Sequence, residues 1–393
     1  MEQTRDVVVI GGAVMGASVA YWLTRARPGL RVLVVEMDPT HARAATALSV
    51  ASVRQQFTNP VNVEISRFGV RFIRDFGAEL GLEEGAGDLG LKENGYLFLA
   101  GSAGGARVMQ EVAAMQRDHG AATEVLTPDG IAARWPWMNT ADIVAGSFGP
   151  RDEGWFDNMG LLAGFRSAAR RQGAGFLTGR VTGIDLVAGR IAGVRLTSGE
   201  RIGCGVVVNA AGTRAAGVMR MAGLDLPVEP RKRTVFVLDA PNARHPEAPL
   251  LVDHLGYYLR PEHGQWIAGI VPEDDGPCDA DDFEPDHHLF EEMIWPRLYE
   301  RSEGFDAVKV VRSWAGHYDY NTLDQNAVLG AHPGCPGLYL MNGFSGHGLQ
   351  QAPAVGRGLA EAILDGRYGT IDLSDLGVER VLEGRPFPER AVV

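Results

Sequence analysis

The chain has 393 residues, 45% of them hydrophobic and 22% charged, which is the composition of a globular protein with room for two domains and a sizeable core. A formal net charge of −12 disfavours binding to nucleic acid or to anionic membrane surfaces, and no apolar run is long enough to span a bilayer. No secretory signal is recognisable and the three cysteines lack disulfide or zinc spacing, so we expect a protein of the reducing cytoplasm.

The start of the chain predicts one βαβ unit. Val7–Ile10 is a continuous apolar run, typical of a buried strand, and a glycine turn follows at Gly11–Gly16. The next segment is helical as far as Pro28-Gly29, which ends it, and Arg31–Asp38 has the pattern of a second buried strand.

The turn departs from the dinucleotide fingerprint G-x-G-x-x-G at one position, because its frame is Gly11, Ala13 and Gly16. The methyl group of Ala13 narrows the approach of the backbone to a pyrophosphate without closing it. Glu36, at the end of the second strand, is the acidic residue that binds ribose hydroxyls, and its charge disfavours the 2′-phosphate of NADP. The unit therefore predicts a dinucleotide site, with a turn that binds no ligand as the weaker alternative.

Further along the chain, the pattern mixes helices with short strands. A helix is predicted to start at Asn59-Pro60, with an apolar face formed by Ile65, Phe68, Phe72 and Phe76. Other predicted elements are a strand at 94–100, helices at 127–136 and 158–172, three strands with tight turns over 175–212, and mostly strands over 230–318 around one helix near 287–303. The last part reads as a strand, a glycine loop and an amphipathic helix.

Two features favour FAD over NAD. A β-meander leads into VVVNAAG, whereas a dehydrogenase that binds NAD(H) would alternate strands and helices. In addition, FSGHGLQQ places a glycine loop before a second helix, whose positive N-terminal end suits the pyrimidine edge of a reduced flavin.

IGGAVMGASVAYWL, VVVNAAG, HYDYNTLDQNAVLG and GFSGHGLQQAPAVGRGLAE resemble the D-amino-acid oxidase superfamily, and its sarcosine oxidase/glycine oxidase branch in particular. RAATALSVASVRQQF further resembles bacterial relatives of the mitochondrial FAD-dependent oxidoreductase-domain assembly factor of complex I. The resemblance implies an α/β (α+β) fold of two discontinuous domains. A glutathione-reductase-like Rossmann domain for FAD would comprise 1–88, 150–228 and 322–393, and a substrate domain with a large, mostly antiparallel sheet would comprise 89–149 and 229–321.

The resemblance also implies the activity. Such enzymes are FAD-dependent amine or amino-acid oxidoreductases, which take hydride from the carbon next to the amine of a small secondary or N-methyl amino acid and give an imine. An alternative is a non-enzymatic assembly or interaction protein that holds FAD structurally. The partners expected are a small amine substrate and an electron acceptor, either oxygen or another carrier.

Five residues are implied at the substrate. Arg54 matches the arginine that pairs with the substrate carboxylate, and Tyr258 matches a tyrosine of the substrate sheet. Arg260 follows on the same side of the strand as a second carboxylate candidate. His347 lies in the flavin-edge loop, where it contacts substrate or flavin. Gln350 replaces a carboxylate-binding lysine of sarcosine oxidases, which weakens the case for sarcosine as the substrate.

The implied FAD contacts come from the two glycine turns, the end of the second strand, the loop after it and the C-terminal glycine loop. They are Gly11, Gly12, Ala13, Val14, Met15, Gly16, Glu36, Met37, Arg43, Ala44, Ser49, Ser52, Val181, Ala210, Ala211, Gly212, Gly343, Phe344, Ser345, Gly346, His347, Gly348, Leu349 and Gln350.

Two departures from the family pattern refine the prediction. Relatives that tether FAD use a cysteine where Gly316 and His317 stand, or a histidine that ALSVAS lacks, so we expect non-covalent FAD. Sarcosine oxidases place a lysine over the flavin to activate oxygen, but GYYLRPEHGQWIAG contains none. A dehydrogenase with another electron acceptor is therefore a candidate, unless His263 or His317 supplies the positive charge.

Three further groups of charged or titratable residues predict no chemistry. The adjacent histidines His287-His288 point about 100° apart on a helix and predict a solvated face instead of a metal site. The acidic stretch Asp274–Asp286 predicts a loop, and the basic stretch Arg231–Thr234 predicts the flank of a strand.

Overall fold

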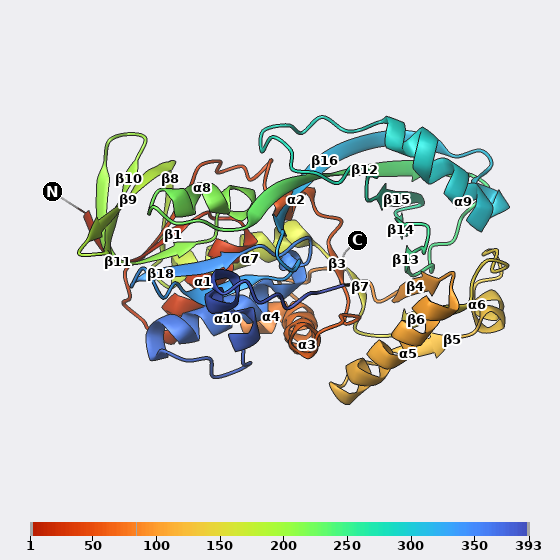
Figure 1. Cartoon of the computed structure of the whole chain (residues 1–393), viewed down its shortest axis with the longest axis horizontal. Coiled ribbons are helices and arrows are strands. Elements are labelled where there is room, and N and C mark those ends of the chain that lie inside the picture. Colours follow the sequence, from red (N-terminus) through yellow and green to blue (C-terminus); the bar gives the residue numbers. More distant parts are fainter. Residues whose placement is uncertain (1–2, 84, 391–393) are drawn as a thin grey trace.

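The computed structural model describes residues 3–83 and 85–390 and has two lobes, each built around one large sheet (Figure 1). The first sheet carries the βαβ unit at its centre. Its strands run in the order β17 (Val328–Ala331), β18 (Leu338–Asn342), β11 (Arg201–Asn209), β1 (Gln3–Ile10), β2 (Val32–Glu36) and β8 (Gly175–Thr178), with β10 (Arg190–Leu196) and β9 (Val181–Val187) continuing from β11. β1 pairs in parallel with both β2 and β11, as the βαβ pattern predicts.

Alternation along β1 explains how both faces of this sheet are buried. Val7 and Val9 pack with the helices on one face, and Val8 and Ile10 pack with the β9–β10 meander on the other. The continuous apolar run predicted this arrangement, since a strand that alternates with polar residues would leave one face in water.

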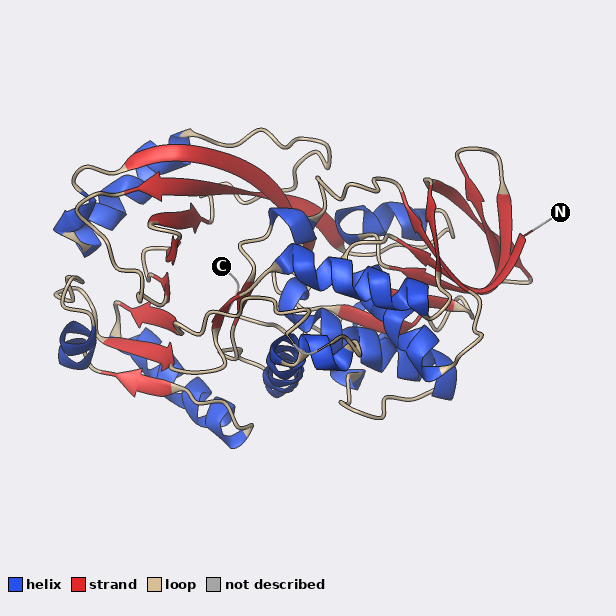
Figure 2. Ribbon diagram, turned by 180° about the vertical axis from the view of Figure 1, so that it is seen from behind, coloured by secondary structure: helices blue, strands red, loops and turns tan. Residues whose placement is uncertain are grey.

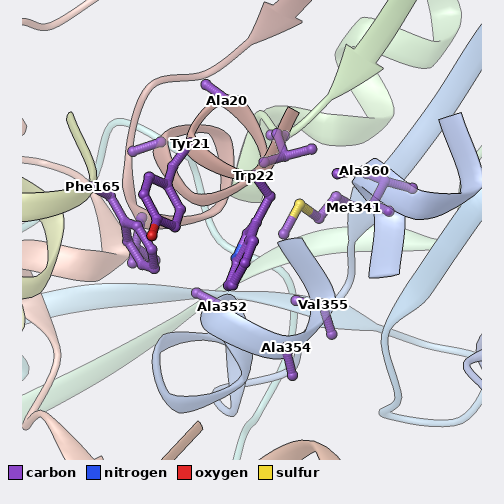
Figure 3. Close-up of a cluster of buried hydrophobic side chains, with 14 of the residues drawn as sticks. Ala20, Tyr21, Trp22, Phe165, Met341, Ala352, Ala354, Val355 and Ala360 are labelled. Carbon is purple, nitrogen blue, oxygen red and sulfur yellow. The ribbon is translucent and has the colours of Figure 1, made fainter. Parts of the chain in front are cut away.

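Three helices cover the helical face of the first sheet: α1 (Val14–Ala26), α7 (Asn158–Arg171) and α10 (Gly348–Asp365). Figure 3 shows their contact, in which Tyr21 and Trp22 of α1 lie between Phe165 and the small residues of α10. The aromatic rings of Tyr21 and Phe165 are 5.4 Å apart, centre to centre. α3 (Pro60–Arg74) packs against α10. This packing holds the loop that precedes α3 close to the start of α10.

The second sheet is mostly antiparallel and is seen from behind in Figure 2. Its strands run in the order β16 (Lys309–Asn321), β12 (Val228–Asp239), β15 (Gln265–Ile270), β14 (Tyr257–Glu262), β13 (Leu250–Val252), β4 (Tyr96–Ala100), β6 (Ala145–Gly149) and β5 (Glu124–Leu126). The long pair β12 and β16 extends toward the first lobe (Figure 1). The start of β12 and the end of β16 therefore line the same cavity as the glycine turns. Only β13 and β4 pair in parallel among the neighbours in this order.

The described residues also form seven further α-helices and a two-stranded sheet. The helices are α2 (Ala45–Leu48), α4 (Phe76–Glu79), α5 (Ala103–Asp118), α6 (Pro128–Arg134), α8 (Ala215–Arg220), α9 (Trp295–Arg301) and α11 (Val378–Leu382), and β3 (Ser52–Val53) pairs with β7 (Gly154–Trp155). Three of the four proposed domain boundaries fall outside the strands, whereas the one after residue 228 falls inside β12, one residue from its start, and the division remains a proposal.

Three sequence expectations differ from the structure. The segment 175–212, predicted to hold three strands, holds four, because β8 joins β2 in parallel and β9 then begins the meander. The helix predicted near 287–303 is a π-helical turn, Phe290–Ile294, followed by the short α9. Asn59 stands at the N-cap of α3 as predicted, but its side chain donates to the Pro388 carbonyl instead of capping the helix.

Candidate active site

A cavity of about 1170 Å³ runs along the junction of the two sheets. Ile10, Val35 and Ala210 line it from the first sheet, and Val235 and Tyr258 from the second. Because the same cavity reaches the predicted nucleotide turn and the predicted substrate residues, one bound cofactor can contact both groups.

The nucleotide turn is shaped by two glycines that no larger residue can replace without movement. Gly11 has φ 99°, and a Cβ there would clash with the Ala210 carbonyl. A Cβ on Gly16 would clash with the Gly11 carbonyl, so α1 packs directly on the turn. Ala13 stands at the N-cap of α1 with extended backbone and lines the cavity, which shows that the middle position of the fingerprint accommodates a methyl group.

Glu36 closes the turn from the end of β2. Its Oε2 accepts from the Gly12 backbone N–H at 2.7 Å, and its Oε1 accepts from the Asp38 N–H at 2.8 Å. His41, which the sequence analysis did not single out, is buried beside it with Nδ1 3.9 Å from Glu36 Oε2. Neither ring nitrogen of His41 makes a hydrogen bond within the described residues, and burial lowers the pKa of the imidazole. The ring nitrogens of this neutral histidine are therefore suited to form hydrogen bonds with a cofactor bound in the cavity.

Most of the predicted FAD contacts line the cavity. Those that do are Gly11, Ala13, Val14, Met15, Glu36, Met37, Arg43, Ala44, Ser49, Ser52, Val181, Ala210, Ala211, Gly212, Phe344, Ser345, Gly346, His347, Gly348, Leu349 and Gln350. The other three do not line it but contact residues that do. Gly12 donates to Glu36, Gly16 packs on the Gly11 carbonyl, and Gly343 donates to Asp319. Arg43 is largely exposed, and its Nη1 lies 3.8 Å from Asp281 Oδ1 on the acidic loop.

Asp319 of β16 binds the backbone of the loop that precedes α10. Asp319 Oδ2 accepts from the backbone N–H groups of Gly343 and Phe344 at 2.9 and 3.2 Å. Burial raises the pKa of Asp319 to about 6, against the opposing effect of these hydrogen bonds. Gly346 has φ 95°, and a Cβ there would meet the ring of Tyr318, so the loop can lie flat against β16 only with glycine at this position.

Arg54 is a buried cation at the end of the cavity that is predicted to bind substrate, with 3% of its surface exposed. Its guanidinium carbon lies 4.1 Å from the centre of the Phe57 ring and 5.4 Å from that of Phe98. Nη1 donates to the Gln56 carbonyl, whose side chain is in turn bonded to buried Glu153 at 2.8 Å. The guanidinium is thus fixed by aromatic faces and by its own loop, as a carboxylate-binding arginine requires.

Three tyrosines enclose the same end of the cavity. Tyr258 of β14 lines it as predicted, and Tyr96 and Tyr318 line it without having been predicted as site residues. Burial raises the pKa of all three phenols, so each stays neutral and can donate a hydrogen bond. Tyr318 belongs to the segment HYDYNTLDQNAVLG, but the sequence does not indicate that this residue of β16 lines the cavity.

Gln350 and His347 both lie at the start of α10 and line the cavity. Gln350 Oε1 accepts from the Arg54 N–H at 2.7 Å and from the Ser66 hydroxyl at 3.1 Å. The amide carbonyl therefore positions Arg54. His347 contacts the Phe57 ring edge to face, with centres 5.2 Å apart.

Arg260 does not line the cavity, which corrects its assignment as a second carboxylate ligand. Its guanidinium pairs with Glu262, donates to the Val50 carbonyl at 3.0 Å and lies 4.9 Å from the Trp155 ring. Burial lowers the pKa of Arg260, against the opposing effect of Glu262. Alternation along β14 puts the residue on the expected face, but its long side chain extends past the cavity to a partner of its own.

Arg233 corrects a second expectation, because Arg231–Thr234 lies inside β12 and Arg233 lines the cavity. Its two terminal nitrogens donate to Asp275 at 2.6 and 2.9 Å, and its guanidinium carbon lies 4.9 Å from the Tyr318 ring. The acidic stretch is a loop, as predicted, and this contact ties it across the cavity wall. Both partners are far apart in sequence, so no local signal could have found the pair.

None of the three lysines lines the cavity. Lys232 pairs with Asp282 and Asp286 at 3.0 and 2.8 Å. Of the two histidines considered as substitutes, His263 has 81% of its side chain exposed and lies outside the cavity. His317 lines it, but burial lowers the pKa of its imidazole and its Nε2 lies 2.6 Å from the Asp282 carbonyl oxygen.

Within residues 3–83 and 85–390, no cluster of three or more histidine, cysteine, aspartate or glutamate side chains forms a metal-ligand set. In the same residues, no helix is both long and apolar enough to cross a membrane.

Comparison with known proteins agrees with this geometry. The family model described as FAD dependent oxidoreductase (DAO) matches residues 6–362. The FAD-dependent oxidoreductase domain-containing protein 1 of Xenopus laevis is 40% identical over 99% of this chain and 85% of its own length. The mitochondrial dimethylglycine dehydrogenase of Mus musculus is 28% identical over 95% of this chain but only 44% of its own length. Among solved structures, L-proline dehydrogenase from P. horikoshii superimposes with a TM-score of 0.87 at 27% identity, covering 98% of this chain and all of that one.

Proposed function

Because the chain belongs to the DAO family of FAD-dependent oxidoreductases, we propose that it oxidises a small amino acid with a secondary or N-methylated amine. The substrate would lose hydride from the carbon next to its nitrogen and leave as an imine. When bound, the flavin supplies the two-electron acceptor for this chemistry.

The residues present fit a bound FAD. Gly11 and Ala13 would face the pyrophosphate at the N-terminus of α1, and Glu36 with His41 would face the ribose. His347 and Gly348, at the N-terminus of α10, would face the flavin edge, where the helix end favours negative charge. We propose that this binding is non-covalent.

The observation that carries the proposal is the setting of Arg54. Its buried guanidinium lines the cavity, is held against the Phe57 and Phe98 rings, and lies at the same end as three neutral phenols. A substrate carboxylate would bind an arginine held in this way in bidentate geometry. Its binding would fix the neighbouring amine and C–H bond for reaction.

The tyrosines and the aromatic rings serve the remaining needs of the reaction. Tyr96, Tyr258 and Tyr318 hold neutral hydroxyls that can orient a carboxylate or a neutral amine. Phe57 and Phe98 exclude water around Arg54, which strengthens the ion pair.

The amine class is supported by two of the matched proteins. They are named for proline and for dimethylglycine, amino acids whose nitrogen carries more than one carbon. Since no lysine lines the cavity, we propose that the electrons pass to an acceptor other than oxygen.

The alternative is a protein that holds FAD structurally and has no substrate. The two functions differ in one measurement: the bleaching of bound FAD under anaerobic conditions by a panel of N-methyl, cyclic and primary amino acids. We expect at least one secondary amino acid to bleach the flavin, and Arg54→Ala to abolish bleaching at the same substrate concentration. The matched control is Arg71→Ala, an exposed arginine of α3, which should bleach like the wild type. No bleaching by any amine would contradict the enzymatic proposal.

A further inference from the structure

The C-terminal segment of the chain, which lies beyond the end of the family model at residue 362, returns to the loop that leads into α3. Asp324 anchors it, because the Phe387 N–H donates to Asp324 Oδ2 and the Glu389 N–H donates to the Asp324 carbonyl, both at 3.0 Å. The charge of Asp324 is itself paired with Arg380, at 2.8 Å. The anchor therefore places Glu389 without adding an unpaired charge next to it.

The carboxylate of Glu389 is completely buried behind the loop that leads into α3. Its Oε1 accepts from the Thr58 N–H at 2.9 Å and from the Thr58 hydroxyl at 2.7 Å. Its Oε2 accepts from the side-chain amides of Asn62 and Asn59 at 2.9 and 3.3 Å. A buried carboxylate with this many donors is held in the ionised form.

Two contacts connect this carboxylate to the start of α10. Asn62, which donates to Glu389, accepts at Oδ1 from Gln351 Nε2 at 3.2 Å. Phe57, next to Thr58, packs edge to face against the His347 ring. Glu389 thus lies behind both the loop and the first turn of the helix at whose N-cap His347 stands.

The four side-chain and backbone donors are neutral, whereas His347 carries the opposite charge when protonated. Burial alone would raise the pKa of Glu389, but attraction to His347, together with the hydrogen bonds from Asn62 and Thr58, holds it below the ordinary value. An attraction that favours the carboxylate favours the imidazolium equally, since the coupling is reciprocal.

We propose that Glu389 is a positioning residue, which fixes the His347 imidazole at the edge of the cavity and stabilises its positive charge. Other charged groups near His347 are Asp319, beneath the loop that precedes it, and Arg54, across the Phe57 ring. Glu389 differs from both because the C-terminal segment carries it.

The effect on the flavin rests on the proposed function, but the His347–Glu389 coupling does not. The test is a titration of the His347 side-chain nitrogens by ¹⁵N NMR in the FAD-loaded protein, with His347→Gln to assign the signal. We expect Glu389→Gln to weaken proton binding by His347 at least roughly tenfold. The matched control, Glu383→Gln, removes an exposed carboxylate of the same segment and should leave the titration unchanged.

Equal proton affinity of His347 in the wild type and in Glu389→Gln would overturn the proposal. If that variant does not fold, the wild-type titration decides alone. A His347 that is already neutral at about pH 6, below the ordinary histidine pKa, overturns the proposal, and one that stays charged above that value supports it. Separately, the midpoint potential of bound FAD should fall in Glu389→Gln, because less positive charge then stabilises the reduced ring. If the titration of His347 changes but the midpoint potential of FAD does not, the proposed position of the flavin is wrong, whereas the coupling between His347 and Glu389 is confirmed.

Discussion

The backbone N–H of Arg54 donates to the side-chain carbonyl of Gln350 at 2.7 Å, so the first turn of α10 holds the arginine that the substrate carboxylate is expected to meet. The Ser66 hydroxyl of α3 donates to the same oxygen. One buried amide therefore links the helix at the proposed flavin edge to the proposed substrate site.

Gln350→Met should disturb that link with little change in volume. Two buried donors lose their acceptor, which costs about 1–3 kcal/mol in the free energy of unfolding. We also expect a higher KM for carboxylated substrates with a smaller effect on kcat, because Arg54 is displaced while the flavin contacts persist. Urea unfolding and steady-state kinetics measure the two effects, and Gln110→Met on the exposed face of α5 is the control. An unchanged KM would show that Gln350 does not position Arg54.

The nucleotide turn predicts opposite outcomes for two substitutions three residues apart. Gly16→Ala places a methyl group against the Gly11 carbonyl, so α1 must move away from the turn, and we expect loss of bound FAD and a lower Tm. Ala13→Gly removes a methyl group from the cavity wall and should leave FAD bound. The ratio of FAD to protein after purification, read from the absorption spectrum, distinguishes the two. Retention of FAD by Gly16→Ala would contradict the packing argument.

The βαβ unit could be predicted from the sequence because its determinants are local. The apolar run at Val7–Ile10 and the spacing from Gly11 to Gly16 reflect contacts within a few residues or between adjacent strands. The helix α5 had no such signal, because it is a surface helix with three buried residues, Ala106, Ala113 and Gln116. Its weak apolar stripe does not stand out from the surrounding polar residues.

At the site, the residues predicted correctly to face the cavity are those next to glycine turns or strand ends, such as Glu36 and His347. Arg260 shows why alternation along a strand is not sufficient. Its face was predicted, but its side chain pairs with Glu262 of the same strand and packs on Trp155 of β7, which belongs to the separate two-stranded sheet. Glu389 is the extreme case, since its partners lie more than 300 residues earlier in the chain.

Glu153 should make the stability of the fold depend on pH. Burial raises the pKa of its carboxyl to about 7 from an ordinary value near 4.5. As pH rises from 4.5 to 7, the unfolded chain loses this proton while the folded chain keeps it, so the stabilisation present at low pH is lost over that window. Glu153→Gln removes this contribution, and its free energy of unfolding should fall less than that of the wild type between pH 5 and pH 8.

The measurement is urea unfolding at several pH values for the wild type, Glu153→Gln and the exposed control Glu111→Gln. The glutamine also alters the hydrogen bonds to Gln55 and Gln56, so its stability at a single pH is lower for a separate reason. Only the difference in slope reports on the titration of Glu153. Parallel pH profiles for the wild type and Glu153→Gln would contradict the raised pKa.

The cavity predicts slow reaction with oxygen. Oxygen reduction by a flavin builds negative charge, which a cation over the ring stabilises, but the three lysines lie elsewhere, burial lowers the pKa of His317, and the charge proposed for His347 would lie at the flavin edge. We expect turnover with oxygen to be at least about tenfold slower than with an artificial two-electron acceptor, which corresponds to a modest loss of charge stabilisation. Peroxide formation and acceptor reduction, measured on the same sample, give the ratio. Fast peroxide formation by the wild type would contradict the prediction. If His317→Gln abolishes it, His317 supplies the positive charge; if His317→Gln forms peroxide equally fast, the reaction requires neither a lysine nor His317.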